Sequence, residues 1–116
     1  LPMKGTRVGL LGISYKANVD DVRESPSLKI MELLENYGCD FEVFDPHILH
    51  KSTVKDLKTL LKRSTALILA TNHDEFLALD GEMLKKHGIK VIVDGKNCLD
   101  KQKIKKSGII YKGIGR

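Results

Sequence analysis

The stretch Val8–Pro26, VGLLGISYKANVDDVRESP, decides the fold of this chain. Its apolar beginning is part of a predicted buried strand, Thr6–Leu11, while Ser25 and Pro26 predict the cap and the first position of a helix. Charged residues lie between these two elements: Lys16, Asp20, Asp21, Arg23 and Glu24. Open α/β sheets place their binding crevice where strands end before helices. We therefore expect a binding site at this loop.

Strand and helix patterns alternate along the rest of the chain. Further strands are predicted at Phe41–Phe44, Ala66–Ala70, Val91–Val93 and Ile109–Tyr111. Four helices are predicted between successive strands. The first ends at Gly38 and has Leu28, Met31, Leu34 and Tyr37 on its apolar face, and the second spans Ser52–Lys62 with Ser52 or Thr53 as its cap. The third runs from an Asn72 cap to Gly88 and is loosened near Gly81, and the fourth is short and basic. This order predicts an α/β fold, a Rossmann-like doubly wound parallel sheet of about five strands with helices on both faces.

Length and composition indicate one domain that spans residues 1–116. No apolar stretch approaches the roughly 20 residues of a membrane-spanning helix, and no secretory leader is present, so we expect a cytoplasmic protein without a membrane partner. Cys39 and Cys98 have neither CxxC spacing nor a second pair, so we expect reduced thiols and no metal site. Because the sequence starts with Leu-Pro and lacks an initiator methionine, we expect a fragment of a longer protein.

The net charge of +5 comes largely from the C-terminal third of the chain. Lys101, Lys103, Lys105 and Lys106 crowd one short segment, which is typical of a solvated helix face. The alternative is a site for a phosphate-rich partner. The chain has no tryptophan and no aromatic residues interleaved with the lysines, so we do not expect nucleic acid.

Two features of the sequence suggest nucleotide chemistry. Gly9 and Gly12 form a GxxG without the third glycine of a dinucleotide fingerprint, so we expect packing glycines and no self-sufficient NAD site. Lys16 and Arg23 flank two aspartates, so this loop is either an internally neutralised ion-pair network or a surface that offers cations to a phosphate. Lys96 follows the fourth strand and would add a third cation, which predicts an anion site formed by two adjacent strand ends.

No residue of the chain is predicted to be catalytic. His47, His50, His73 and His87 have no ligand partners at suitable spacing, and we expect each at the surface or at a helix cap. Cys98 has no accompanying base or oxyanion motif, so we expect a small buried residue there.

Four segments, in order, carry a resemblance to a known family: GLLGISYKANVDDVRESPSLKIMELL, VFDP, ATNHDEF and VDGKN. Together they resemble the C-terminal, UDP-binding domain of the UDP-glucose/GDP-mannose dehydrogenase family, and the DDVRESP form is closer to the branch that acts on UDP-N-acetylhexosamines. The resemblance implies an enzyme that oxidises the sugar C6 alcohol to a carboxylate in two NAD-dependent steps, for polysaccharide precursor synthesis. It also implies that this chain lacks the N-terminal domain that binds most of the NAD and the central catalytic domain, and is inactive alone.

The resemblance also assigns roles to individual residues. Tyr15, Lys16 and Lys96 match nucleotide-sugar contacts, and Lys96 stands where the family usually has arginine. Arg23 matches the arginine that reaches the NAD pyrophosphate, and neither cysteine matches the family's nucleophile. The implied partners are a UDP-sugar and the rest of the same polypeptide or its dimer mate.

Two other functions fit parts of the pattern. A receiver-like signalling domain would use Asp20, Asp21, Asp45 and Lys96 at strand ends, although its phosphoacceptor belongs after the third strand, where this chain has Thr71. A non-catalytic scaffold domain would use the basic helix to dock onto a partner and would bind no UDP-sugar.

Overall fold

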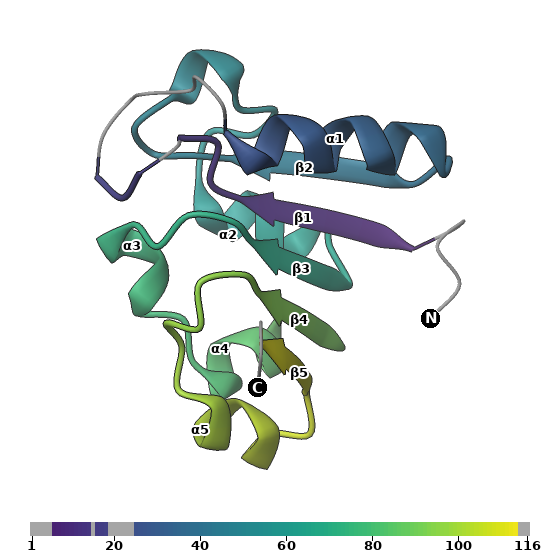
Figure 1. The fold of residues 1–116 in the computed structure, drawn as a ribbon. Coiled ribbons are helices and arrows are strands. Elements are labelled where there is room, and N and C mark those ends of the chain that lie inside the picture. Colours follow the sequence, from purple (N-terminus) through teal and green to yellow (C-terminus); the bar gives the residue numbers. More distant parts are fainter. Residues whose placement is uncertain (1–5, 15, 19–24, 114–116) are drawn as a thin grey trace.

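The computed structural model describes residues 6–14, 16–18 and 25–113. In this part the chain forms a five-stranded parallel sheet with the order β2-β1-β3-β4-β5 (Figure 1). The strands are β1 (Arg7–Leu11), β2 (Asp40–Phe44), β3 (Ala66–Leu69), β4 (Val91–Asp94) and β5 (Ile110–Gly113). The helices are α1 (Pro26–Asn36), the 3-10 helix η1 (Leu49–Lys51), α2 (Leu57–Lys62), α3 (Asp74–Leu77), α4 (Gly81–Lys86) and α5 (Lys101–Lys106). The predicted fold class and all five strands are confirmed, with strand bounds shifted by at most two residues.

The strand order reverses at the centre of the sheet. Leu10 of β1 pairs with Val43 of β2 on one side and with Ile68 of β3 on the other. The chain therefore moves outward from β1 to β2 and then returns past β1 to form β3, β4 and β5. Such a reversal creates the crevice at the strand carboxyl ends where open α/β sheets bind ligands.

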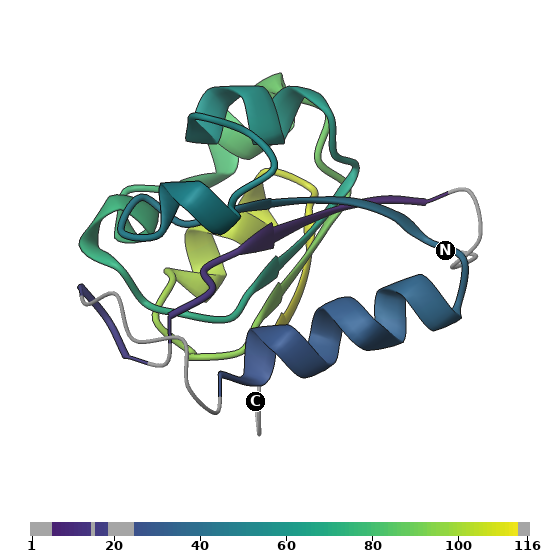
Figure 2. The same ribbon diagram turned by 90° about the horizontal axis from the view of Figure 1, so that it is seen from above.

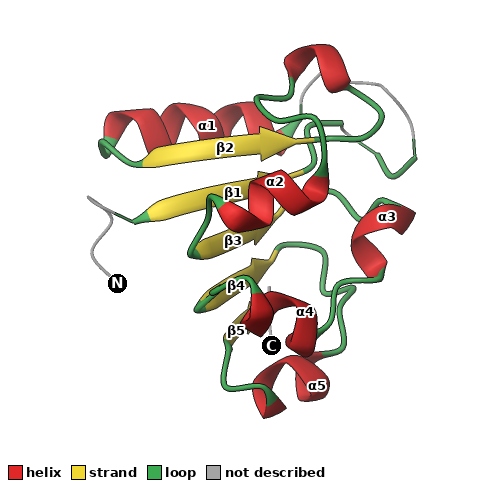
Figure 3. Cartoon of the chain, turned by 180° about the vertical axis from the view of Figure 1, so that it is seen from behind, coloured by secondary structure: helices red, strands yellow, loops and turns green. Residues whose placement is uncertain are grey.

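The helices lie in two layers. Helix α1 packs against one face of the sheet, while α2, α3, α4 and α5 lie on the other side (Figures 2 and 3). The larger core cluster lies under these four helices and includes Leu60, Phe76 and Ile104. The side of α1 buries two smaller clusters around Leu10 and Leu34.

The face that carries α1 is only partly covered within the described residues. An apolar groove of about 370 Å³ runs beside α1 across β3, β4 and β5. Ile68, Val93 and Ile110 line it, and Ile110 is 55% exposed. Parallel sheets are normally covered on both faces, so this groove is an unusual feature for a parallel sheet.

The two glycines of the GxxG are packing glycines, as predicted. A Cβ atom on Gly9 would lie 2.5 Å from both Leu60 Cδ2 and Ser64 Oγ, so β1 approaches α2 closely only without a side chain there. Gly12 closes the end of β1 against Thr71 with a φ of +102°.

Helix α1 starts as predicted, since Ser25 Oγ accepts a hydrogen bond from Ser27 N at 3.2 Å and Pro26 follows it. Its apolar face was predicted only in part: Leu34 is buried, but Leu28 and Tyr37 are 44% and 63% exposed. Ser27 occupies a buried position instead because its hydroxyl donates to a backbone carbonyl at the end of β1, at 2.6 Å.

The predicted helix over Ser52–Lys62 is too long at its start. Helix α2 begins at Leu57, and Asp56 caps it, so the predicted cap at Ser52 or Thr53 is wrong. The Ser52 hydroxyl instead accepts a hydrogen bond from Asp45 N, just after β2, at 2.9 Å, and the Thr53 hydroxyl accepts one from Val43 N, in β2, at 2.8 Å. The segment before α2 therefore lies along β2 rather than extending the helix.

The predicted helix from an Asn72 cap to Gly88 has the wrong cap, and the loosening predicted near Gly81 is a full break. Two short helices, α3 and α4, replace it, and Asp80 caps the second by accepting a hydrogen bond from Met83 N at 2.9 Å. The residue that precedes α3 directly is His73, whose side chain makes no capping bond because it points into the protein.

Candidate functional site

The loops after β1, β2, β3 and β4 leave the sheet at its carboxyl edge, where the sequence predicts a binding site. Lys16 follows β1 and Lys96 follows β4, and both are exposed. Tyr15 and Arg23 lie outside the described residues. The prediction that the cations come from two adjacent strands is wrong for the two lysines, because the returning chain inserts β3 between β1 and β4.

Asp45, the first residue after β2, is fully buried and anchors the segment after β1. Its Oδ2 atom accepts hydrogen bonds from Ile13 N at 2.7 Å, Ser14 N at 2.9 Å and the Ser14 hydroxyl at 3.0 Å. His73 Nε2 lies 2.9 Å from the same oxygen, while His47 N donates to Oδ1 at 2.8 Å. One carboxylate thus joins the ends of three strands.

The charge of Asp45 is stabilised by these donors. Burial alone raises the pKa of this carboxyl, because the anion loses its hydration. The hydrogen bonds from Ile13, Ser14, His73 and His47 together outweigh burial, so the pKa lies below its ordinary value of 3.8. Asp45 is therefore an anion at neutral pH.

His73 extends this anchor to a second point of the same segment. Its Nδ1 atom accepts a hydrogen bond from Asn18 N at 2.7 Å and therefore carries no proton. The ring proton is on Nε2, which faces Asp45 Oδ2 and lies 2.8 Å from Ser14 Oγ. The two hydrogen-bonding edges of the ring thus set its tautomer.

We call residues 12–14 and 16–18 the β1 loop. Two further contacts join it to the chain after β3: Thr71 Oγ1 donates to Ser14 O at 2.8 Å, and Asp74 N donates to Asn18 Oδ1 at 3.1 Å. Asn18 adopts a φ of +58°, a conformation that asparagine tolerates better than most residues. Among the described residues, no buried side-chain nitrogen or oxygen lacks a hydrogen-bond partner.

Ser14, His73 and Asp45 have the composition of a hydrolytic triad but not its geometry. In a triad the serine and the carboxylate contact different ring nitrogens, whereas here both contact Nε2. Nδ1 is occupied by the backbone of Asn18, and all three side chains are at most 1% exposed. This arrangement is a structural anchor and cannot act as a nucleophile.

A second buried carboxylate, Asp94, organises the loop that carries Lys96. Its Oδ1 atom accepts a hydrogen bond from Lys96 N at 3.1 Å, and its Oδ2 atom accepts from Leu99 N at 2.9 Å and from the Tyr111 hydroxyl at 2.7 Å. Both predicted cations with a described position therefore sit on loops that buried aspartates hold in place.

Cys98 is half-buried beside Asp94, so it is less buried than predicted. Burial, the negative charge of Asp94 and its hydrogen bond raise the pKa of Cys98 from 9.0 to about 11. The thiolate is the reactive form, so this shift suppresses its reactivity at neutral pH.

We expect iodoacetamide to alkylate Cys98 at pH 8 about tenfold more slowly than a cysteine in an unstructured peptide. The raised pKa lowers the thiolate fraction about a hundredfold. A thiolate of higher pKa is also about tenfold more nucleophilic, so the net rate falls about tenfold. Asp94→Asn should accelerate the reaction, whereas Asp100→Asn, at the exposed cap of α5, should not. Peptide mapping by mass spectrometry measures the rates, and equal rates in the two variants would contradict the role of Asp94.

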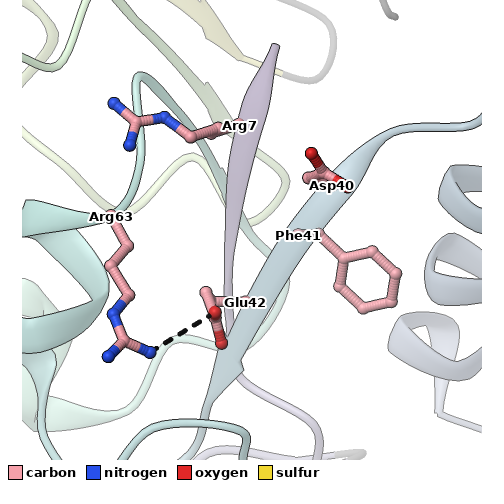
Figure 4. A pocket seen from close by; sticks show the side chains of 5 residues that line it. All are labelled: Arg7, Asp40, Phe41, Glu42 and Arg63. Atoms are coloured by element: carbon pink, nitrogen blue, oxygen red, sulfur yellow. Dashed lines mark ion pairs between the residues drawn. The ribbon is translucent and has the colours of Figure 1, made fainter. Parts of the chain in front are cut away.

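A separate pocket of about 200 Å³ lies at the opposite edge of the sheet, where β1 and β2 begin (Figure 4). Arg7, Asp40, Phe41, Glu42 and Arg63 line it, and Arg63 pairs with Glu42 at 3.6 Å. Its lining carries both positive and negative side chains, and it lies at the amino ends of β1 and β2, whereas the β1 loop follows the carboxyl end of β1. We assign it no part in the predicted site.

His73 is an anchoring residue that the sequence analysis missed. The prediction of a surface or capping position is correct for His47, His50 and His87. His73 occupies the cap position of α3, but it is fully buried and its side chain makes no capping bond. A signal was present, because His73 closely follows one predicted strand and Asp45 directly follows another. Polar residues at such positions meet at one sheet edge.

The basic helix α5 is a solvated face, as predicted. Lys103, Lys105 and Lys106 are exposed, and Ile104 turns into the core. In the described part of the chain, no three His, Cys, Asp or Glu side chains gather in a way that could hold a metal ion. Each helix of that part is too short or too polar to cross a bilayer.

Comparison with known proteins identifies the family of this chain. The family model described as "UDP-glucose/GDP-mannose dehydrogenase family, UDP binding domain" matches residues 9–101. That range includes the β1 loop, both buried aspartates and the loop of Lys96.

Relatives agree with this assignment over nearly the whole chain. The UDP-N-acetyl-D-mannosamine dehydrogenase of Pyrococcus horikoshii is 33% identical over 94% of the chain, and the UDP-glucose 6-dehydrogenase of Rickettsia conorii is 34% identical over 97%. The crystal structure of the NDP-N-acetyl-D-galactosaminuronic acid dehydrogenase from Methanosarcina mazei superimposes with a TM-score of 0.91 at 29% identity, over 99% of this chain and 26% of that one. The chain spans about a quarter of the length of the curated relatives, 25% and 29% of these two. With its fold, anchored loops and family match together, this chain belongs to the UDP-glucose/GDP-mannose dehydrogenase family, as its UDP-binding domain.

Proposed function

We propose that the carboxyl edge of the sheet binds the nucleotide part of a UDP-sugar, with Lys16 and Lys96 as contacts to the ligand. The observation that carries this proposal is that each lysine sits on a loop held by a buried aspartate, Asp45 or Asp94. Ammonium groups on ordered loops suit a pyrophosphate, because a loop that is ordered before the ligand arrives loses less conformational entropy on binding. Tyr15 is proposed as a third contact from its match to the family pattern.

The proposed activity belongs to a longer polypeptide that contains this domain. Its reaction is the two-step oxidation of the sugar C6 alcohol to a carboxylate with NAD, as the resemblance implies, for polysaccharide precursor synthesis. Other domains would supply the nucleophile and most of the NAD site, and Arg23 would reach the NAD pyrophosphate. This chain alone should then reduce no NAD with a UDP-sugar.

Two features support a longer polypeptide as the partner. The relatives are about four times as long as the aligned segment. The apolar groove beside α1 leaves part of a parallel sheet uncovered, and parallel sheets are rarely stable in that state. We propose that further residues of the same polypeptide cover it.

The receiver-like alternative loses its best phosphoacceptor in the structure. Asp45 is 0% exposed, and its carboxylate oxygens already accept five hydrogen bonds. Phosphorylation there would require the β1 loop to detach. The scaffold alternative differs from our proposal in predicting no UDP-sugar binding.

Titration with UDP-N-acetylglucosamine, UDP-glucose and UDP, followed by amide chemical shifts, tests the proposal. We expect shifts clustered at Tyr15, Lys16 and Lys96. Lys96→Ala should weaken UDP binding by about tenfold or more, because a hydrogen bond to a charged group contributes about 1.5–3 kcal/mol, and Lys96→Arg should retain binding or strengthen it through a bidentate contact. Lys105→Ala, which removes an exposed lysine of α5, is the matched control. Absence of shifts at high UDP concentration would favour the scaffold function for the isolated chain.

A further inference from the structure

The β1 loop is fixed at two separate points by two different side chains. Asp45 holds its beginning through Ile13 and Ser14, and His73 holds its end through Asn18. Lys16 lies between the two points. The position of Lys16 therefore depends on both anchors.

We propose that His73 is a positioning residue for nucleotide binding, which keeps the second half of the β1 loop in its binding conformation before the ligand arrives. The inference rests on the proposed function, since it assumes that Lys16 contacts the nucleotide. His73 itself is fully buried, so we expect it to act through the loop rather than by contact with the nucleotide. Its effect is on the entropy of the loop, because a loop that is already ordered loses less freedom on binding.

The chemistry of histidine explains why this position needs both of its nitrogens. Nε2–H donates towards Asp45, which sets the orientation of the ring. Nδ1 then presents an acceptor to Asn18 N at 2.7 Å. The rigid ring therefore links the Asp45 carboxylate, through Nε2–H, to Asn18 at the end of the β1 loop, through Nδ1. Of the two nitrogens, only Nδ1 contacts Asn18.

Two conservative variants separate these roles. In His73→Asn the amide oxygen can take the place of Nδ1 and keep the bond to Asn18, but the side chain is too short to reach Asp45. In His73→Gln the amide nitrogen can take the place of Nε2 and keep the bond to Asp45, but nothing accepts from Asn18. Both variants are polar and lose similar packing, so their stabilities should be comparable. Ile104→Val in α5, at the other end of the sheet, reports the effect of mild destabilisation alone.

Amide hydrogen exchange tests the loop without any ligand. We expect the protection of the Asn18 amide to stay within about threefold of wild type in His73→Asn and to fall more than tenfold in His73→Gln. Nitrogen-15 shifts of the wild-type His73 ring should show the Nε2–H tautomer. Equal protection of Asn18 in the two variants, or a proton on Nδ1, would overturn the positioning role.

UDP titration tests the consequence for binding. His73→Asn and Ile104→Val should bind within about threefold of wild type, and His73→Gln should bind about five- to tenfold more weakly, in line with one lost hydrogen bond. Equal affinities of the two His73 variants would overturn the inference, even if the exchange rates differ. If the wild-type chain does not bind UDP, the proposed function fails for the isolated chain, and so does the predicted effect of His73 on binding. The protection of the Asn18 amide in His73→Asn and His73→Gln then still decides whether His73 positions the loop.

Discussion

Asp45→Ala is expected to lower the free energy of unfolding by about 3–5 kcal/mol, the range for removing one partner of a buried charged network. The substitution leaves Ile13 N, Ser14 N and the Nε2–H of His73 without their acceptor in a site closed to water. Each such buried donor costs about 1–3 kcal/mol, and relaxation of the loop recovers a part. Urea denaturation of the chain measures the effect.

The matched control is Asp56→Ala, which removes an aspartate at the exposed cap of α2. Its carboxylate accepts a hydrogen bond from Thr59 N at 2.7 Å and another from the Thr59 side chain at the exposed helix start, and the loss should be about 1 kcal/mol. A loss for Asp45→Ala as small as this would contradict the anchoring role of Asp45.

Acid sensitivity gives a second measure of the same anchor. The folded pKa of Asp45 is lowered, so its charge adds stability above the ordinary value of 3.8, and this stability is lost as the pH falls through the lower folded pKa. Wild type should therefore lose more stability than Asp45→Ala between pH 5 and the acid limit of folding. Parallel pH profiles for the two proteins would show that Asp45 contributes nothing to acid unfolding.

Most of the fold could be predicted because its signals are local. Apolar runs mark the five strands, and Ser25 with Pro26 marks the start of α1. One error arose where polar side chains bonded to the preceding strand: the hydroxyls of Ser52 and Thr53 accept hydrogen bonds from β2 and the residue after it instead of capping α2. Local pattern does not distinguish a capping hydroxyl from one that binds a neighbouring strand.

The place of the proposed site in the fold could be predicted from the sequence, but the contacts that build it could not. The β1 loop and Lys96 were predicted at the carboxyl edge, and the two lysines lie there. Asp45 and His73 are 28 residues apart, and their contact depends on the strand reversal that sets β2 and β3 on either side of β1. Their positions after two strands predict that both lie at the carboxyl edge, but the sequence does not show that they touch.

The two buried aspartates serve one purpose in different places. Asp45 follows β2, Asp94 ends β4, and each accepts backbone N–H bonds from a loop with a proposed ligand-binding lysine. A carboxylate suits this task because its two oxygens accept several donors at once. The charges proposed for ligand binding are thus exposed, whereas the charges that position them are buried.

Gly12→Ala is expected to cost about 3 kcal/mol of stability and to displace the β1 loop. The new Cβ would lie 2.5 Å from both Thr71 Cβ and Thr71 Oγ1 and 2.9 Å from Thr71 N, and the backbone φ of +102° is strained for alanine. Strain contributes about 1–2 kcal/mol, and overpacking contributes a similar amount. Gly12 also bonds Phe44 O through its N–H and Ser27 Oγ through its carbonyl, at 2.9 and 2.6 Å, so it cannot move without further loss.

Gly38→Ala separates the strain from the clash. Gly38 has a φ of +71°, and a Cβ there meets nothing within 4 Å, so this variant should lose only about 1 kcal/mol. Urea denaturation compares the two variants, and amide shifts of Lys16 and Asn18 should move in Gly12→Ala but not in Gly38→Ala. If the two glycines cost the same, the contact with Thr71 does not constrain the loop. If Gly12→Ala lowers the free energy of unfolding more than Gly38→Ala does, the contact with Thr71 leaves no room for a side chain at the carboxyl end of β1. Tight packing of β1 against the chain after β3 then helps to fix the position of the β1 loop.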